Sequence, residues 1–234
     1  QLDENRDNFL DFSDFQKFMM FKNSAKGLPV PPRHPKKRQI SGSRMSPTSE
    51  AVLARCVVKI WTSVTEKSYF KPWTVHPTHS CTGTGFVVDA KKRFIITNAH
   101  VVRCHSSVHV RLYGSHERVP AQVLYISEEK DLALLTVPLD VFWENVQSEA
   151  EFASSVPMQF EPTIVIGYPL GGSTISMTKG VVSRVDCRSY NHRGENTTRL
   201  LVIQIDAAIN SGNSGGPVFN RNGKVVGVAF SGLD

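Results

Sequence analysis

The chain lacks any long apolar run. Its 234 residues contain no stretch of about 18 consecutive apolar residues, so we expect no membrane-spanning helix. Only four cysteines are present, Cys56, Cys81, Cys104 and Cys187, and none forms the C-x-x-C spacing that is typical of structural zinc sites. We therefore expect no zinc. The cysteines predict isolated buried thiols or, in an oxidising compartment, a bond between Cys81 and Cys104.

Acidic residues are absent between Lys22 and Ser49. The basic residues of this segment are Lys22, Lys26, Arg33, Lys36, Lys37, Arg38 and Arg44. The formal net charge of the chain is +6, so without these seven charges the remainder carries −1. We interpret residues 23–50 as a basic Pro- and Ser-rich linker. Its "RHPKKR" is interpreted as a solvated run and not as a nuclear address, and we expect no nucleic-acid partner.

The chain does not begin with methionine, and its first residues already form a metal-binding pattern. We expect the sequence to be a fragment whose missing N-terminus carried any targeting signal. Side-chain oxygens at positions 1, 3, 5, 9 and 12 of a loop, with a backbone carbonyl at position 7, suit one hard cation. In this order, with the carbonyl residue included, they belong to Asp3, Asn5, Asp7, Phe9, Asp11 and Asp14. The pattern resembles the calcium loop of an EF-hand, and "FQKFMMF" supplies the exiting helix.

The resemblance predicts a partial EF-hand in residues 1–22 that binds Ca²⁺. An acidic helix cap is the alternative. Asn8 replaces the glycine of position 6, and asparagine tolerates the turn. Asp14 replaces the glutamate of position 12 with a shorter side chain, so we expect weaker calcium binding or more tolerance of magnesium.

Helix-forming patterns are scarce after Arg55, where short apolar runs alternate with turn signals. The runs are "CVVKIWTSV", "TGTGFVVDA", "RFIITNAHVV", "SVHVRLY", "VPAQVLYI", "DLALLTV", "TIVIGYP", "KGVVSRV", "RLLVIQID", "GGPVFN" and "KVVGVAF". They are rich in Val and Ile, which is typical of strands. Asn222-Gly223 predicts a hairpin, and only residues 138–152 favour a helix. The pattern indicates an all-β fold, either a sandwich or paired barrels.

Histidine is absent after Ser214, the serine of "GNSGG". The spacing satisfies G-x-S-x-G, but that nucleophile elbow requires a following helix and a later histidine. Here Pro217 and a hairpin follow, which excludes the elbow. A base must come from upstream, and His100 ends an apolar strand in "FIITNAHVV". Asp131 opens the apolar strand "DLALLTV", and the order His100, Asp131, Ser214 is that of the chymotrypsin-type triad.

Several ordered motifs resemble the HtrA/Deg family of serine proteases, most closely its plant-type branch. They are "TGTGFVV", "IITNAHVV", "DLALLTV", "VIGYPLGG", "GVVSRV" and "IQIDAAINSGNSGGPVFN", spread over residues 55–234. The resemblance implies a protease domain in residues 51–234, built of two perpendicular six-stranded barrels. The second barrel is expected to be truncated, since the chain stops before its last strand.

The resemblance also implies roles for individual residues. Ser214 is the nucleophile, His100 the general base and Asp131 the group that orients the histidine. Gly212, Asn213 and Ser214 form the oxyanion hole. Ile209 and Leu233 line an apolar primary pocket that favours small aliphatic side chains.

The resemblance further implies an ATP-independent endopeptidase that needs no cofactor for catalysis and acts on unfolded or damaged proteins. It implies a trimer-based homo-oligomer in a chloroplast, a mitochondrion or the nucleus. The alternative is a calcium-responsive chaperone or scaffold with a silent protease fold. The intact triad and glycine loop favour the enzyme.

Overall fold

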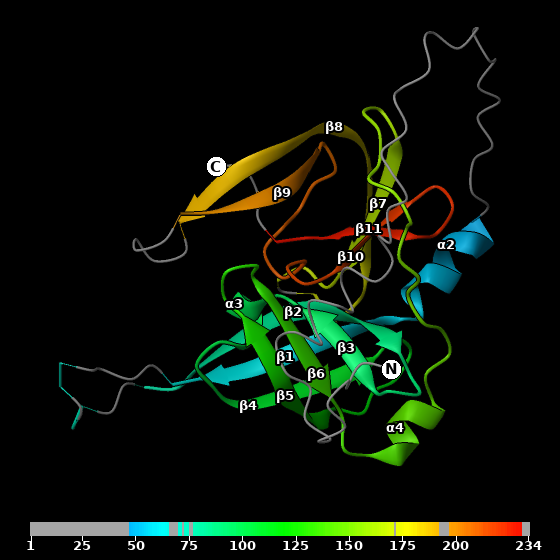
Figure 1. The fold of residues 1–234 in the computed structure, drawn as a ribbon. Coiled ribbons are helices and arrows are strands. Elements are labelled where there is room, and N and C mark those ends of the chain that lie inside the picture. The colour runs from blue at the N-terminus through cyan, green and yellow to red at the C-terminus, as the bar shows by residue number, and fades with distance from the viewer. Residues whose placement is uncertain are drawn as a thin grey trace, which may run out of the picture. The chain divides into compact units, whose positions relative to one another are not determined.

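The computed structural model describes residues 47–65, 70–71, 73–74, 77–170, 172–191 and 197–230 (Figure 1). The helices of this part are α2 (Pro47–Ala54), α3 (Ala99–Val102) and α4 (Asp140–Glu144). Its strands are β1 (Val57–Val64), β2 (His79–Asp89), β3 (Phe94–Thr97), β4 (His105–Leu112), β5 (Val119–Ser127), β6 (Leu132–Thr136), β7 (Pro162–Gly167), β8 (Ser176–Asn191), β9 (Thr197–Ile205), β10 (Pro217–Asn220) and β11 (Val225–Val228).

The strands form two antiparallel systems. The first six close into a barrel in the order β1-β2-β3-β6-β5-β4, coloured cyan to green in Figure 1. The remaining described strands form an open five-stranded sheet in the order β11-β10-β7-β8-β9. The prediction of an all-β, chymotrypsin-like fold is therefore confirmed.

Each apolar run that predicted a strand contains one, with a single internal difference. "RFIITNAHVV" is β3 only as far as Thr97, and the chain then turns into the short helix α3. The turn is closed by hydrogen bonds from Val101 N–H to Asn98 O and from Arg103 N–H to Ala99 O. The helix expected in residues 138–152 exists as the shorter α4. Helix α2 was not predicted, and it begins inside the range interpreted as linker.

The hairpin predicted at Asn222-Gly223 joins β10 to β11. The side-chain Oδ1 of Asn220 accepts hydrogen bonds from the backbone N–H groups of Asn222 and Lys224, both at 3.0 Å. A side-chain oxygen that satisfies backbone donors in this way stabilises a tight turn. The hairpin prediction is confirmed, and its first strand, β10, begins three residues after Ser214.

The barrel core follows from period-two alternation. In β4, Val108, Val110 and Leu112 are buried in the main core cluster, whereas His109 and Arg111 between them are not buried. Each buried branched side chain contributes about 1.5–3 kcal/mol relative to exposure. The same alternation places Val58 and Ile60 of β1 in this core, so Lys59 between them lies on the outer face of the barrel.

Several predictions concern residues 1–46 and Leu233, which lie outside the described residues. They are the calcium loop with its ligands, most of the linker and one wall of the primary pocket. All four cysteines are free thiols: Cys56 is buried, but Cys104 and Cys187 are exposed, so the expectation of buried thiols is wrong for these two. In the described part of the chain, no helix is both long and apolar enough to cross a membrane.

Candidate active site

Strand pairing brings His100 and Asp131 together. Strands β3 and β6 are antiparallel neighbours, and Thr97 at the end of β3 pairs with Ala133 near the start of β6. The segment that follows β3 and the segment that precedes β6 therefore lie at the same end of the barrel. His100 lies in α3 directly after β3, and Asp131 directly precedes β6. Two residues that are 31 apart in sequence become neighbours.

Asp131 holds His100 through both carboxylate oxygens. Its Oδ1 accepts a hydrogen bond from the backbone N–H of His100 at 2.9 Å, and its Oδ2 lies 2.7 Å from His100 Nδ1. The Asp131 side chain is only 5% exposed, whereas that of His100 is 39% exposed. The imidazole is thus fixed on its Nδ1 side by a buried acid while its other edge is accessible. This is the arrangement that a general base requires.

The backbone at Asp131 is held in an unusual conformation. Its φ is +50°, a left-handed value that aspartate and asparagine adopt more readily than most residues. The side-chain amide of Asn98 donates a hydrogen bond to the carbonyl oxygen of Asp131 at 2.8 Å. Asn98 is 1% exposed. A buried neighbour therefore fixes the peptide that carries the acid.

The loop that carries Ser214 is docked onto the first barrel by its backbone. The N–H of Thr84 in β2 donates to the Ser214 carbonyl at 2.9 Å. On the side of the second sheet, Gly215 N–H donates to Ala229 O at 2.7 Å, and Ala229 N–H donates to Gly216 O at 2.9 Å. The serine is held between the two strand systems, with its main chain fixed on both sides.

Thr84 makes a further set of contacts that the sequence did not reveal. Its Oγ1 donates to Gly212 O at 2.7 Å and accepts from Tyr168 N–H at 2.9 Å. Its own carbonyl accepts from Thr97 Oγ1 at 2.7 Å. Thr84 is fully buried, so each of these groups would be costly to leave unpaired. One threonine of the first barrel thus connects β3, the end of β7 and the Ser214 loop.

Ser214 and the helix of His100 lie against the same glycine. A Cβ placed on Gly83 would lie 2.6 Å from Val101 Cγ1 and 3.3 Å from Ser214 O. Both segments therefore pack on this residue. Among the described residues, no hydrogen bond joins the Ser214 hydroxyl to the imidazole of His100. The structure brings His100 and Asp131 into direct contact and places Ser214 on an adjoining segment.

Two glycines of the serine loop are required by their surroundings. Gly212 has φ +95° and Gly215 has φ +85°, in the region that favours glycine. A Cβ on Gly212 would lie 2.5 Å from Tyr168 O, and one on Gly215 would overlap the carbonyl oxygen of Thr84 and the hydroxyl of Thr97. Glycine lets the loop closely approach the segment after β7 at Gly212 and the first barrel at Gly215.

We expect Gly215→Ala to destabilise the protein. The alanine would combine left-handed strain with overpacking against buried backbone, and overpacking alone costs about 1–3 kcal/mol. Gly114→Ala is a matched control, because Gly114 has φ +78° but a Cβ added there would meet no atom within 4 Å. Urea unfolding measures the two free energies. Equal losses in the two variants would contradict the close approach at Gly215.

The other predicted site residues lie in the same loop. Asn213 is buried, with its Oδ1 unpartnered among the described residues. In that part of the chain, the N–H groups of Gly212 and Ser214 donate to no backbone carbonyl. Ile209 is half-buried and packs against the second core of Val165, Ala207, Val218 and Ala229. The loop thus contains two backbone N–H groups without a backbone acceptor, in Gly212 and Ser214, and the apolar residue Ile209.

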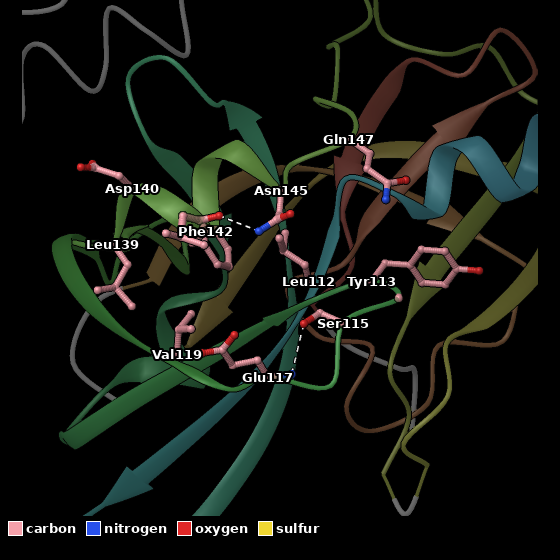
Figure 2. Close-up of a pocket in the computed structure, with 12 residues that line it drawn as sticks. Leu112, Tyr113, Ser115, Glu117, Val119, Leu139, Asp140, Phe142, Asn145 and Gln147 are labelled. Carbon is pink, nitrogen blue, oxygen red and sulfur yellow. Dashed lines mark hydrogen bonds between the residues drawn. The ribbon is translucent and has the colours of Figure 1, made fainter.

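A pocket of about 540 Å³ lies away from this site (Figure 2). It is formed by the turn between β4 and β5 and by α4, and it shares no residue with His100, Asp131 or the Ser214 loop. Two of its polar side chains are hydrogen-bonded to residues close in sequence: Asn145 donates to Val141 O, and Ser115 accepts from Glu117 N–H. Its lining contains no histidine, cysteine or lysine. No group of three or more metal-binding side chains exists among the described residues.

Known proteins similar to this chain are proteases. A family model described as "Trypsin-like peptidase domain" matches residues 83–228. "Protease Do-like 4, mitochondrial" of Arabidopsis thaliana is 45% identical over 174 residues, 74% of this chain and 32% of that protein. "Protease Do-like 2, chloroplastic" of the same plant is 41% identical over 181 residues, 77% of this chain and 29% of that protein.

A solved protease structure is also similar to this chain. The active form of the Rv3671c protease of M. tuberculosis superposes with a TM-score of 0.66 at 25% identity, covering 88% of this chain and 85% of that chain. The chain spans only about 30% of the length of these two plant relatives.

Proposed function

We propose that this chain, which belongs to the trypsin-like peptidase domain family in its HtrA/Deg branch, is a serine endopeptidase with His100, Asp131 and Ser214 as its triad. The observation that carries the proposal is that the buried carboxylate of Asp131 contacts both the backbone N–H and Nδ1 of His100. The adjoining Ser214 loop is hydrogen-bonded through its backbone to both strand systems. An accessible imidazole that a buried carboxylate holds on its Nδ1 side is the arrangement expected of a general base.

The chemistry follows from which histidine nitrogen is engaged. Nδ1 faces Asp131, so Nε2 takes the proton of the Ser214 hydroxyl as the oxygen attacks the scissile carbonyl. His100 then returns this proton to the leaving amine, and an acyl-enzyme forms on Ser214. Water activated by the same imidazole hydrolyses the ester. Asp131 fixes the tautomer and stabilises the imidazolium in both halves of the reaction.

We propose that the N–H groups of Gly212 and Ser214 stabilise the developing oxyanion, with Asn213 shaping the loop between them. Such donors act best when they are fixed before the reaction. Thr84 supports this role, since its hydroxyl holds the Gly212 carbonyl and its N–H holds the Ser214 carbonyl. Thr84 is a positioning residue in this scheme.

We expect Thr84→Val to lower kcat by about 10²-fold, the lower end of the effect of losing one oxyanion donor. Valine keeps the shape of threonine but leaves Gly212 O and Tyr168 N–H without their partner. Steady-state cleavage of a peptide substrate measures the effect, and KM should change little. Thr84→Ser keeps the hydroxyl and should restore most of the rate. If serine and valine reduce kcat equally, the hydroxyl does not position the loop.

We propose unfolded or damaged proteins as substrates, cleaved without ATP after small aliphatic residues. Ile209, half-buried and apolar beside the loop, supports an uncharged primary pocket. Leu233 is proposed as its second wall. A trimer-based homo-oligomer and an organellar location belong to the same proposal, and the mitochondrial and chloroplastic names of the relatives support the organelle and not the nucleus.

The pattern of residues 3–14 supports a calcium-dependent rate as a further element of the proposal. Titrating Ca²⁺ into the full-length protein, beside Asp3→Ala, tests it with both proteolysis and oligomer size as readouts. We expect a calcium response in the wild type that Asp3→Ala reduces. A rate and an oligomer size that calcium leaves unchanged would remove calcium from the proposal.

A fluorophosphonate probe tests the proposed enzyme directly. Such probes phosphonylate a serine only when a neighbouring base activates it, so peptide mapping should find the label on Ser214 alone. His100→Ala should lose the label while the fold is retained. A folded wild type that takes no label and cleaves no unfolded protein, with or without calcium, would favour the scaffold alternative.

A further inference from the structure

Three cations lie side by side on the outer face of the closed barrel. Strands β1 and β4 pair with Lys59 directly opposite Arg111. Arg118 directly precedes Val119, which pairs with Val110 on the other side of β4. The three side chains therefore come from β1, from β4 and from the residue just before β5. Like charges directly opposite each other in a sheet are destabilising, so this arrangement requires an explanation.

Lys59 is the most unusual member of this cation row. It is only 7% exposed, and burial lowers the pKa of its amine, with further lowering by the charges of Arg111 and Arg118. In the described part of the chain, no ion pair joins Lys59, Arg111 or Arg118 to an acid. A buried cation is costly unless an opposite charge compensates it. The three charges are therefore not compensated by an acid in the described part of the chain.

The cation row converges on one aromatic ring. Lys59 Nζ lies 5.1 Å from the centroid of Trp61, and the guanidinium carbons of Arg111 and Arg118 lie 5.3 Å and 4.0 Å from it. Lys59 Nζ also lies 5.7 Å from the Tyr168 ring. These contacts hold the long side chains together around a common centre and limit the freedom that binding would remove.

Each side chain of the cation row has donors without a hydrogen-bond partner among the described residues. Lys59 donates to Gly172 O and Arg111 donates to Ser173 O at 2.7 Å, so one bond of each holds the turn that precedes β8. An ammonium has three donors and a guanidinium five. Arg111 Nε is buried and has no partner among the described residues. The cation row therefore has both uncompensated charge and unused donors.

We propose that Lys59, Arg111 and Arg118 form a binding site for a phosphate group. A single carboxylate would neutralise one of the three charges, whereas a phosphate group carries about −1.5 to −2 charges near neutral pH and several acceptor oxygens. Guanidinium groups match such oxygens with paired, charge-assisted hydrogen bonds. The free ion and a phosphorylated peptide share this group. Binding requires no proteolysis, so the inference is independent of the proposed function.

Isothermal titration of the full-length protein tests the site, with inorganic phosphate and a short phosphoserine peptide as separate ligands. Ionic strength is kept constant with chloride, because salt screens exposed charges. Arg118→Gln removes an exposed cation, and we expect it to weaken phosphate binding about tenfold, the loss of one charge-assisted contact. Lys91→Gln removes one exposed charge elsewhere, in the turn after β2, and should leave binding unchanged.

The two ligands distinguish the source of the phosphate. Saturable binding of the peptide alone would identify a phosphorylated protein partner, and binding of the free ion would identify a small-anion site; either supports the proposal when Arg118→Gln weakens it selectively. Lys59→Met, with its fold checked by thermal unfolding, should also weaken binding. Absence of saturable binding of both ligands, or equal weakening by Arg118→Gln and Lys91→Gln, overturns the proposal.

Discussion

Ser214→Ala is expected to reduce the turnover of an unfolded protein substrate by about 10⁶-fold, the cost of removing the nucleophile from such a triad. The hydroxyl is the only group of this loop that the proposed mechanism converts into a covalent intermediate. The loop itself should stay in place, since its contacts with Thr84 and Ala229 are made by backbone atoms. Release of fluorescent peptides from a labelled, unfolded model protein measures the rate.

Ser211→Ala is the matched control for this loss. Ser211 lies three residues earlier in the same loop, and its backbone carbonyl, which accepts from Leu170 N–H, is unaffected by the substitution. We expect nearly full activity for Ser211→Ala and similar unfolding temperatures for the two variants. If Ser214→Ala kept more than a small fraction of the wild-type rate, another group would be the nucleophile. Equal losses in the two variants would indicate a damaged loop instead.

Local sequence was sufficient to predict the strands and to propose His100 and Asp131 as partners. Runs such as "FIIT" and "LALLT" consist of branched residues bounded by turn signals, and both are strands in the barrel. The pairing of His100 with Asp131 then follows from one piece of topology, the antiparallel neighbourhood of β3 and β6. Chain order predicted the partners, and strand pairing explains how they meet.

The roles of Thr84 and Lys59 could not be predicted from the same information. Threonine is an ordinary strand residue, and Thr84 acquires its role only through bonds to residues 84 and 128 positions away. Lys59 sits in an apolar strand, where alternation indicates an outward and hence solvated side chain. Its burial depends on Trp61, Tyr168 and the turn at Gly172, and its charge conflict depends on the register with Arg111. Neither the register of two strands nor packing between distant residues can be predicted from the local sequence.

Asp131→Asn is expected to lower kcat by about 10⁴-fold while KM changes little. The side-chain amide would present an N–H donor to His100 Nδ1, or would give up the bond to the His100 backbone. The imidazole would then carry its proton on Nε2 and could not accept one from Ser214. Asparagine tolerates the left-handed backbone at this position almost as well as aspartate, so the fold should remain intact. Single-turnover acylation of a peptide ester measures the chemical step separately from substrate binding.

Asp140→Asn provides the comparison that separates the role of Asp131 from a general loss of acidic charge. Asp140 begins α4 and pairs with Arg93 at the surface, where its side chain is 73% exposed. Exposed pairs contribute little to stability, so this variant should retain full kcat. If Asp131→Asn acylated at a rate within about tenfold of the wild type, orientation of His100 by this carboxylate would not be part of the mechanism. A normal unfolding temperature together with a lost chemical step would instead place the effect in the tautomer of His100, because the rest of the site would be unchanged.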